Sequence, residues 1–248
     1  MSDRKNIYFA SDFHLGSPDY QLSRQRENQI VAWLDQIEGN ASEIYLMGDL
    51  FDFWFEYKTV VPKGYIRLLG KLARLSDAGI RLTIFKGNHD LWMKDYFVRE
   101  LNAEVVSQPI VKTFENKTFY LAHGDGLGPG DYGYKFINRI FKAKVNQFLF
   151  SWLHPDIGSK IARYFSDSSR IYQQKTPLIF NGDKERLVIH ARNILKERHI
   201  DYFIFGHRHI PVDYLLNDHS RLINLGDMFN HFSYAFFDGD DVKLLNIS

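Results

Sequence analysis

The sequence of 248 residues contains no cysteine, so disulfide bonds and thiolate metal sites are excluded, which fits a reducing compartment. It also contains no run of about 18 apolar residues, and its first residues, MSDRKNIYFASD, do not resemble a signal peptide. The net charge is only +1, so no overall field favours nucleic acid or a membrane. The sequence therefore predicts a soluble, cytoplasmic protein that is at most peripheral to a membrane, and nothing in it points to a protein partner.

Five short apolar runs each end in a cluster of polar residues: IYFASDFH, EIYLMGD, RLTIFKGNHD, TFYLAHGD and DYFIFGHRH. Continuous apolar character is typical of strands that are buried on both faces. Residues 22–37 and 63–78 have helical spacing and lie between the first three runs, so the alternation predicts one α/β sandwich domain over residues 1–248. Near the C-terminus, RLINLGD, SYAFFDG and VKLLNIS predict three further strands, antiparallel because their connections are short.

Residues 134–153 depart from this alternation because their apolar residues follow helical spacing. The apolar stripe consists of Phe136, Ile137, Ile140, Phe141, Val145, Phe148, Leu149, Trp152 and Leu153. We expect one helix here and a second, short helix at about residues 156–165. The stripe fits either a helix packed on the core or a helical cap over a site, and the pattern alone does not choose between them.

The polar clusters after the expected strands contain the residues suited to catalysis. In α/β sheets, ligands bind beyond the carboxyl ends of the strands. Those ends carry Asp12, His14, Asp49, Asn88, His89, His123, His207 and His209. A single His after a strand is usually structural, but the coincidence at five strand ends favours a metal site. Imidazole and carboxylate together favour Mn, Fe or Zn, and one carboxylate can bridge two ions that promote displacement at phosphorus.

Taken in order, the blocks D-x-H, G-D, G-N-H-D, H and G-H-x-H, from Asp12 to His209, resemble the calcineurin-like metallophosphoesterase superfamily. The resemblance implies an α/β fold, a four-layer αββα sandwich, with two divalent metal ions. It implies that Asp12, His14, Asp49 and His209 hold one ion, and that Asp49, Asn88, His123 and His207 hold the other, with Asp49 as the bridge. By the same resemblance, His89 is the catalytic His that donates to a phosphoryl oxygen or to the leaving group.

Two further Asp residues lie beside these blocks. Asp52 is three residues after Asp49, and in related phosphatases an Asp at this offset pairs with the motif His. We therefore expect Asp52 to orient His89 and to favour its protonated form, which suits a general acid; a helix cap or turn is the alternative. An ionised Asp90 can accept hydrogen bonds but not donate them, so we expect it to fix the loop through backbone N–H groups.

The stretches DFHLG, GDLFDFW and HGDGLGPGDYGYKF, with the helical segment after them, resemble the UDP-2,3-diacylglucosamine pyrophosphohydrolases of lipid A biosynthesis. That branch attacks the α-phosphorus with metal-activated water and gives UMP and 2,3-diacylglucosamine 1-phosphate. Phe53 stands where the protein phosphatases of the superfamily have Arg, which argues against a phosphoprotein substrate. The best-known members of the branch have G-N-R-D where this chain has G-N-H-D, so His89 keeps the general superfamily form.

In that branch a helical insertion after the H-G-D block caps the site and sheathes acyl chains, which implies a cap at about residues 127–176. Phe136, Ile140, Phe141, Phe148 and Trp152 are expected to line an acyl cleft. The segment holds eight basic and three acidic residues, which suits a diphosphate and the anionic cytoplasmic face of a bacterial inner membrane. Substrate contacts are implied for Asn88, His89, Asp131 and Tyr134, and more loosely for Ser168 and Lys175.

Two other functions stay open at this point. A nuclease or nucleotide phosphodiesterase of the same superfamily would need a positive groove with exposed stacking aromatics. The basic segment does not exclude that function, but the long apolar stripe favours acyl chains over nucleic acid. A metal-free scaffold that keeps the fold should lack several ligands, whereas every ligand position is filled here.

Overall fold

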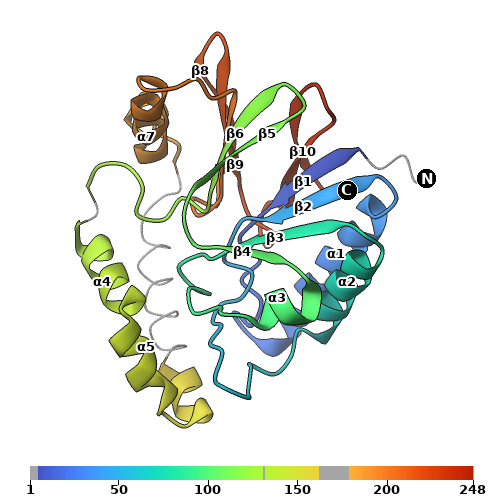
Figure 1. Ribbon diagram of the computed structural model, residues 1–248, viewed down its shortest axis with the longest axis vertical. Coiled ribbons are helices and arrows are strands. Elements are labelled where there is room, and N and C mark those ends of the chain that lie inside the picture. Colours follow the sequence, from blue (N-terminus) through green and yellow to red (C-terminus); the bar gives the residue numbers. More distant parts are fainter. Residues whose placement is uncertain (1–4, 131, 162–178, 248) are drawn as a thin grey trace.

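Figure 1 shows the computed structural model, which describes residues 5–130, 132–161 and 179–247. The first sheet has the strand order β11-β10-β1-β2-β3-β4. Its strands are β1 (Asn6–Ala10), β2 (Ala41–Leu46), β3 (Arg81–Phe85), β4 (Glu104–Val106), β10 (Ser233–Phe237) and β11 (Val242–Asn246). Strands β1 to β4 are parallel, and β10 is antiparallel to both β1 and β11.

The second sheet has the strand order β5-β6-β7-β9-β8. Its strands are β5 (Ile110–Phe114), β6 (Lys117–Ala122), β7 (Tyr202–Phe205), β8 (Pro211–Asn217) and β9 (Ser220–Leu225). Strands β6, β7 and β9 are parallel. The antiparallel prediction is confirmed for SYAFFDG and VKLLNIS, which form β10 and β11. It is wrong for RLINLGD, whose residues 221–225 belong to β9 in the second sheet and run parallel to β7. Strand β8 reverses the chain between them, so β9 returns in the direction of β7.

Helices cover the outer face of each sheet, which gives the predicted four-layer αββα sandwich (Figure 1). The first sheet is covered by α1 (Tyr20–Ile37), α2 (Ile66–Asp77) and α3 (Tyr96–Leu101), and the second by α7 (Arg186–Leu195). Side chains alternate across a strand, so in β1 Tyr8 packs toward the helices and Phe9 packs between the sheets. Where both faces are buried, as in β1 and β7, the strands are almost entirely apolar.

Helices α1 and α2 are anchored at their starts by carboxylates. Asp19 caps α1 by accepting a hydrogen bond of 2.9 Å from the backbone N–H of Leu22. Tyr65 precedes α2 and provides no side-chain cap, and Glu27 of α1 accepts bonds of 2.8 and 3.1 Å from the N–H groups of Arg67 and Leu68. This interhelical cap explains why a Glu is buried on the inner face of α1.

The apolar stripe at residues 134–153 forms two helices, α4 (Tyr132–Lys142) and α5 (Lys144–Ser151), so the prediction of a single helix is wrong. The break lies at Ala143, whose backbone is extended with φ −67° and ψ 124°. Alanine is a good helix former, so the sequence carries no signal for this break. Residues 155–161 are helical, in partial agreement with the second helix expected, and the rest of that prediction lies outside the described residues. None of the described helices has the length and apolar character needed to span a membrane.

Candidate dinuclear metal centre

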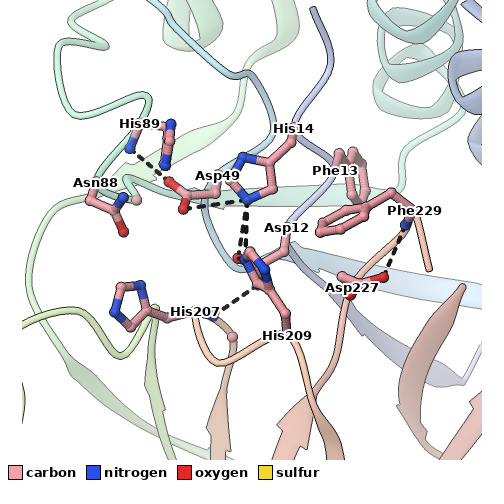
Figure 2. Close-up of polar contacts among 12 residues, drawn as sticks. Asp12, Phe13, His14, Asp49, Asn88, His89, His207, His209, Asp227 and Phe229 are labelled. Atoms are coloured by element: carbon pink, nitrogen blue, oxygen red, sulfur yellow. Dashed lines mark hydrogen bonds and ion pairs between the residues drawn. The ribbon is translucent and has the colours of Figure 1, made fainter. Parts of the chain in front are cut away.

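The seven predicted metal ligands all follow strands that end at one edge of the sandwich. Asp12 and His14 follow β1, Asp49 follows β2, Asn88 follows β3, His123 follows β6, and His207 and His209 follow β7. Neighbouring parallel strands have their carboxyl ends at the same edge, so these loops meet. Figure 2 shows side chains from four of these loops pointing toward one another.

Five of the seven residues have a left-handed backbone. The φ angles are 57° for Asp12, 45° for His14, 54° for Asp49, 66° for His207 and 52° for His209. For a residue with a side chain this conformation costs about 1–2 kcal/mol. Such strain persists only where the surrounding structure enforces it, and it is concentrated at functional sites. Here it aims the carboxylates and imidazoles into one small volume.

Glycines in the motifs allow the loops to approach the ligands closely. A Cβ atom added to Gly206 would lie 2.6 Å from the Oδ2 atom of Asp12, and one added to Gly87 would collide with the carboxylate of Asp49. The Gly of G-H-x-H and the Gly of G-N-H-D are therefore required for the backbone to pass beside these side chains.

The first group of potential ligands consists of Asp12, His14 and His209. The Nε2 atoms of the two imidazoles lie 3.2 Å apart, and Nε2 of His209 lies 3.0 Å from Oδ1 of Asp12. Two ring nitrogens and a carboxylate oxygen facing one another form a donor set that suits a divalent cation. The backbone N–H of His207 donates to the other oxygen of Asp12 at 2.8 Å and fixes the carboxylate.

The second group consists of Asp49, His123 and His207, with Asn88 beside them. Nε2 of His123 lies 3.3 Å from Oδ2 of Asp49 and 3.3 Å from Oδ1 of Asn88. Nδ1 of His123 lies 2.8 Å from the carbonyl oxygen of Met47, which orients the ring with Nε2 toward the site. Burial lowers the pKa of His123, but Asp49 raises it well above its ordinary value, so a cation bound at Nε2 would release a proton.

Asp49 lies between the two groups. Its Oδ2 atom is 3.3 Å from Nε2 of His123 and 3.8 Å from Nε2 of His14. Its Oδ1 atom accepts a hydrogen bond of 2.8 Å from the backbone N–H of His89. One carboxylate oxygen therefore faces both donor sets, which is the arrangement expected of a bridging ligand.

Metal binding needs ionised carboxylates and neutral imidazoles, and four of the ligand residues favour these states before any ion binds. Burial raises the pKa values of Asp12 and Asp49, but His209 beside Asp12 and His123 beside Asp49 bring them well below the ordinary value. Burial lowers the pKa of His14 to about 4, and it lowers the pKa of His207 to about 4 as well. The residues therefore fit a pair of divalent metal ions.

His89 is held beside both groups. Its Nδ1 atom lies 3.1 Å from the backbone carbonyl oxygen of Asp52 and 3.6 Å from Oδ1 of that residue. The imidazole also packs edge-on against His14, with ring centroids 4.7 Å apart. The expected pairing of Asp52 with His89 is present, and the backbone carbonyl makes the closer contact.

Asp90, the last residue of the G-N-H-D block, fixes two loops, as expected. Its carboxylate accepts hydrogen bonds from the N–H of Gly87 at 2.8 Å and from the N–H of Leu50 at 2.7 Å. Burial and the nearby Asp49 raise the pKa of Asp90 to about 7. The bonds tie the loop that carries Asn88 to the loop that carries Asp49.

The loop after β9 contributes a side chain that the motifs do not indicate. The ring of Phe229 lies 5.7 Å from the ring of His14 and 5.2 Å from that of His209, and the Arg26 guanidinium stacks over it at 5.1 Å. Asp227 holds this loop by accepting a 3.1 Å bond from the N–H of Phe229 (Figure 2). Phe229 is 20 residues beyond His209, and only the folded chain brings them together.

An apolar cavity of about 370 Å³ opens beside His89, between the core and helix α4. Its lining residues are Asp52, Phe53, Trp54, Asn88, His89, Leu91, Trp92, Tyr134, Ile137, Asn138, Phe141, Phe150 and Ile161. Of the five residues expected to line an acyl cleft, Phe141 alone lines this cavity; Phe136, Ile140, Phe148 and Trp152 are exposed instead. The break at Ala143 changes the direction of the chain, so Phe150 and Ile161 line it instead.

Asp125, which sequence reasoning did not assign, joins helix α4 to the metal-bearing loops. Its Oδ2 atom accepts hydrogen bonds from the hydroxyl of Tyr134 at 3.0 Å and from Nδ2 of Asn138 at 2.9 Å. The H-G-D motif, in which Asp125 follows His123 by two residues, is the feature of the sequence that could have identified Asp125 as a site residue. Of the expected substrate contacts, Tyr134 lies at the cavity, while Asp131, Ser168 and Lys175 lie outside the described residues.

The two-sheet sandwich, with Asp, Asn and His side chains converging beyond its strand ends, defines a metallophosphoesterase. The calcineurin-like phosphoesterase family model matches residues 5–211, and the chain belongs to that family of metal-dependent hydrolases. Among solved structures, the phosphoesterase YfcE from E. coli is 16% identical, with a TM-score of 0.47 over 97% of this chain and 92% of that chain.

Several relatives carry a more specific name. The chain is 38% identical to a UDP-2,3-diacylglucosamine hydrolase of Porphyromonas gingivalis over 97% of each chain. It is 26% identical to proteins of the same name from Pseudomonas syringae, over 84% of this chain and 85% of that one, and from Hahella chejuensis, over 96% of each. This chain is thus a metallophosphoesterase with UDP-2,3-diacylglucosamine hydrolase homologues along nearly its whole length.

Proposed function

We propose that this protein hydrolyses the pyrophosphate bond of UDP-2,3-diacylglucosamine and releases UMP and 2,3-diacylglucosamine 1-phosphate. The observation that carries the proposal is the apolar cavity that begins at Asn88 and His89, directly beside the candidate metal ligands. A substrate with a phosphate joined to acyl chains needs such a cavity next to the reacting phosphorus, because apolar chains gain free energy by leaving water. The 38% identity to a hydrolase named for this substrate supports the same conclusion.

We infer that two divalent ions, Mn²⁺ with Fe or Zn as alternatives, are held by the residues of the two groups. Asp12, His14, Asp49 and His209 would hold one ion, and Asp49, Asn88, His123 and His207 the other. When bound, such ions supply Lewis acidity that lowers the pKa of water and neutralises charge on a phosphoryl group. The neutral amide of Asn88 keeps the negative charge of this site low enough to admit an anionic substrate.

In this proposal His89 donates a proton to the departing phosphate oxygen or hydrogen-bonds a phosphoryl oxygen. The carbonyl oxygen and Oδ1 of Asp52 lie 3.1 and 3.6 Å from Nδ1 of His89 and fix the orientation of the imidazole. The other ring nitrogen is then the donor. His89 takes the position at which the best-known members of this branch have Arg.

Residues 127–176 are proposed to cap the site within a single domain. The cap touches the core through the Asp125 network and through Trp92, whose indole N–H donates to the carbonyl of Phe141 at 2.8 Å. Acyl chains would occupy the apolar cavity, and Tyr134 would contact the sugar at its mouth. Ser168 and Lys175 remain proposed contacts at the far end of the cap, and Asp131 at its base.

The outer surface of α4 and α5 suits peripheral binding to the cytoplasmic face of an inner membrane. Phe136, Val145, Phe148, Leu149 and Trp152 are all more than half exposed there. The basic residue Lys144 begins α5 on the same pair of helices. Exposed apolar side chains with basic neighbours are typical of segments that lie on anionic membranes. We therefore infer a cytoplasmic enzyme that takes its lipid substrate from the bilayer surface.

The test is to incubate the Mn²⁺-loaded protein with UDP-2,3-diacylglucosamine and, separately, with bis-p-nitrophenyl phosphate. We expect UMP release from the lipid substrate, loss of this activity with a chelator, and its return with Mn²⁺. Cleavage of the generic diester without turnover of the lipid would instead indicate a phosphodiesterase or nuclease. A purified protein that holds no metal and cleaves neither compound would be a scaffold.

A further inference from the structure

Two neighbouring faces of helix α4 line two different cavities that meet at Asn138. The apolar cavity takes Ile137 and Phe141 from one face. The second cavity, of about 360 Å³, takes Arg139 and Lys142 from the next face around the helix. Its inner end is formed by His123, Gly124 and Asp125, so both cavities reach the candidate metal centre. A molecule bound at that centre can therefore extend in two directions.

The second cavity is basic. Lys86, Lys135, Arg139 and Lys142 line it, and Asp125 is the one carboxylate among its lining residues. Asp125 already accepts hydrogen bonds from Tyr134 and Asn138. Among the residues that the structure describes, none forms an ion pair with Arg139. Positive charge gathered at one cavity, in a chain of net charge +1, favours an anionic ligand.

One wall of this cavity comes from outside α4 and is suited to a planar polar ring. Ser107, Gln108 and Pro109 form it, in the connection between β4 and β5, and Leu127 adds an apolar surface. The amide of Gln108 offers one acceptor and two donors, which complements the alternating N–H and C=O groups of a pyrimidine imide. The volume falls within the range of about 300–1,000 Å³ that is usual for small-ligand sites.

We propose that this basic cavity binds the nucleoside monophosphate half of the substrate, a pyrimidine nucleotide. The apolar cavity then holds the acylated half, and the pyrophosphate crosses the metal centre between the two. This inference rests on the proposed function and extends it by assigning each end of the substrate to a cavity. Arg139 neutralises the nucleotide phosphate, and Gln108 reads the edge of the base.

The test compares the affinity of the Mn²⁺-loaded protein for UMP and for methyl phosphate by calorimetry. Both bring a phosphate to the metal centre, but UMP alone can fill the cavity. We expect UMP to bind at least about tenfold more tightly, and Arg139→Gln and Gln108→Ala each to remove most of that advantage. Arg99→Gln, on the exposed surface of α3, serves as the matched control and should change neither affinity.

Hydrogen exchange provides a second readout that does not depend on a variant. Bound UMP should protect backbone amides at residues 107–108 and 135–142 more than those at residues 91–93. Equal affinity for UMP and methyl phosphate, or an advantage of UMP that survives both substitutions, would overturn the assignment even if the lipid substrate is hydrolysed. If UMP binding depends on Arg139 but the lipid substrate is not hydrolysed, the nucleotide cavity stands and the proposed function fails.

Discussion

The edge of the sandwich that carries the metal ligands differs from the α4–α5 segment in almost every physical respect. At the edge, Asp12 and Asp49 are buried on strained backbone and are held by hydrogen bonds from neighbouring loops. Helices α4 and α5 contain no buried residue. The candidate metal centre therefore belongs to a closely packed part of the fold, whereas the proposed choice of substrate depends on a part joined to it by few polar contacts.

Few polar contacts join the two regions where they meet. They include the bonds from Tyr134 and Asn138 to Asp125, the bond from Trp92 to the carbonyl of Phe141, and the pairing of Lys142 with Asp125 at 4.0 Å. In Figure 1, α4 and α5 lie apart from α1, α2 and α3, on the other side of the molecule. Substitutions in the two regions should therefore affect different kinetic parameters.

The largest effect is expected for Asp49→Asn, which removes the carboxylate that faces both donor groups. Turnover should fall by a factor on the order of a thousand or more, because both ions lose a ligand at once. Metal content, measured by mass spectrometry, should fall with it. Asp218→Asn, in the exposed turn between β8 and β9, is the control that should retain both. Near-normal turnover of the Asp49 variant would refute its bridging role.

The next effect is expected for His89→Ala, which removes the proposed proton donor but none of the proposed ligands. The maximal rate should fall by about a hundredfold to ten-thousandfold, the usual contribution of general acid catalysis. The metal content should remain that of the unmodified protein. Loss of metal from this variant would mean that His89 acts as a ligand.

A smaller effect is expected for Tyr134→Phe, which removes one hydrogen bond to the Asp125 carboxylate. A hydrogen bond to a charged group contributes about 1.5–3 kcal/mol. The bond from Tyr134 to Asp125 lies at the mouth of the cavity, where exposure to water reduces this contribution. We therefore expect KM for the lipid substrate to rise by about tenfold. Metal content should not change. Tyr132→Phe, on the same helix and 81% exposed, is the control. Equal kinetics for the two variants would show that this contact does not position α4.

The smallest effect is expected for Trp152→Ser in binding to vesicles that contain anionic phospholipid. Loss of one exposed aromatic ring should weaken sedimentation with the vesicles by about fivefold. Tyr20→Ser is the matched control, because Trp152 and Tyr20 are both 77% exposed but Tyr20 lies on α1, away from α4 and α5. A similar loss for both variants would mean that membrane binding has no preferred face.

Much of the fold and of the candidate site could be predicted because the signal is local. The central strands are largely apolar and are followed by polar residues, so β1 with Asp12 and β2 with Asp49 can be recognised one at a time. Parallel pairing then brings the strand ends together. The hydrogen bonds of Asp90 followed from the same reasoning, because a buried carboxylate beside a turn needs backbone donors.

The remainder depends on contacts between distant parts of the chain. The break at Ala143 has no helix-breaking residue, so periodicity alone could not reveal it or place Phe150 at the cavity. The packing of Phe229 on two imidazoles depends on how the loop after β9 folds back. Asp125 was visible in its motif, but its partners Tyr134 and Asn138 could be identified only in the folded chain.

The measurement that tests the division between chemistry and substrate choice most directly is the ratio of kcat/KM for two nucleotide sugars. One is UDP-2,3-diacylglucosamine and the other is UDP-glucosamine without acyl chains; both carry the same pyrophosphate. If the apolar cavity beside His89 selects the substrate, the acylated compound should be preferred by at least about a thousandfold, since burying the chains supplies the difference. Comparable kcat/KM values for the two compounds would contradict this account.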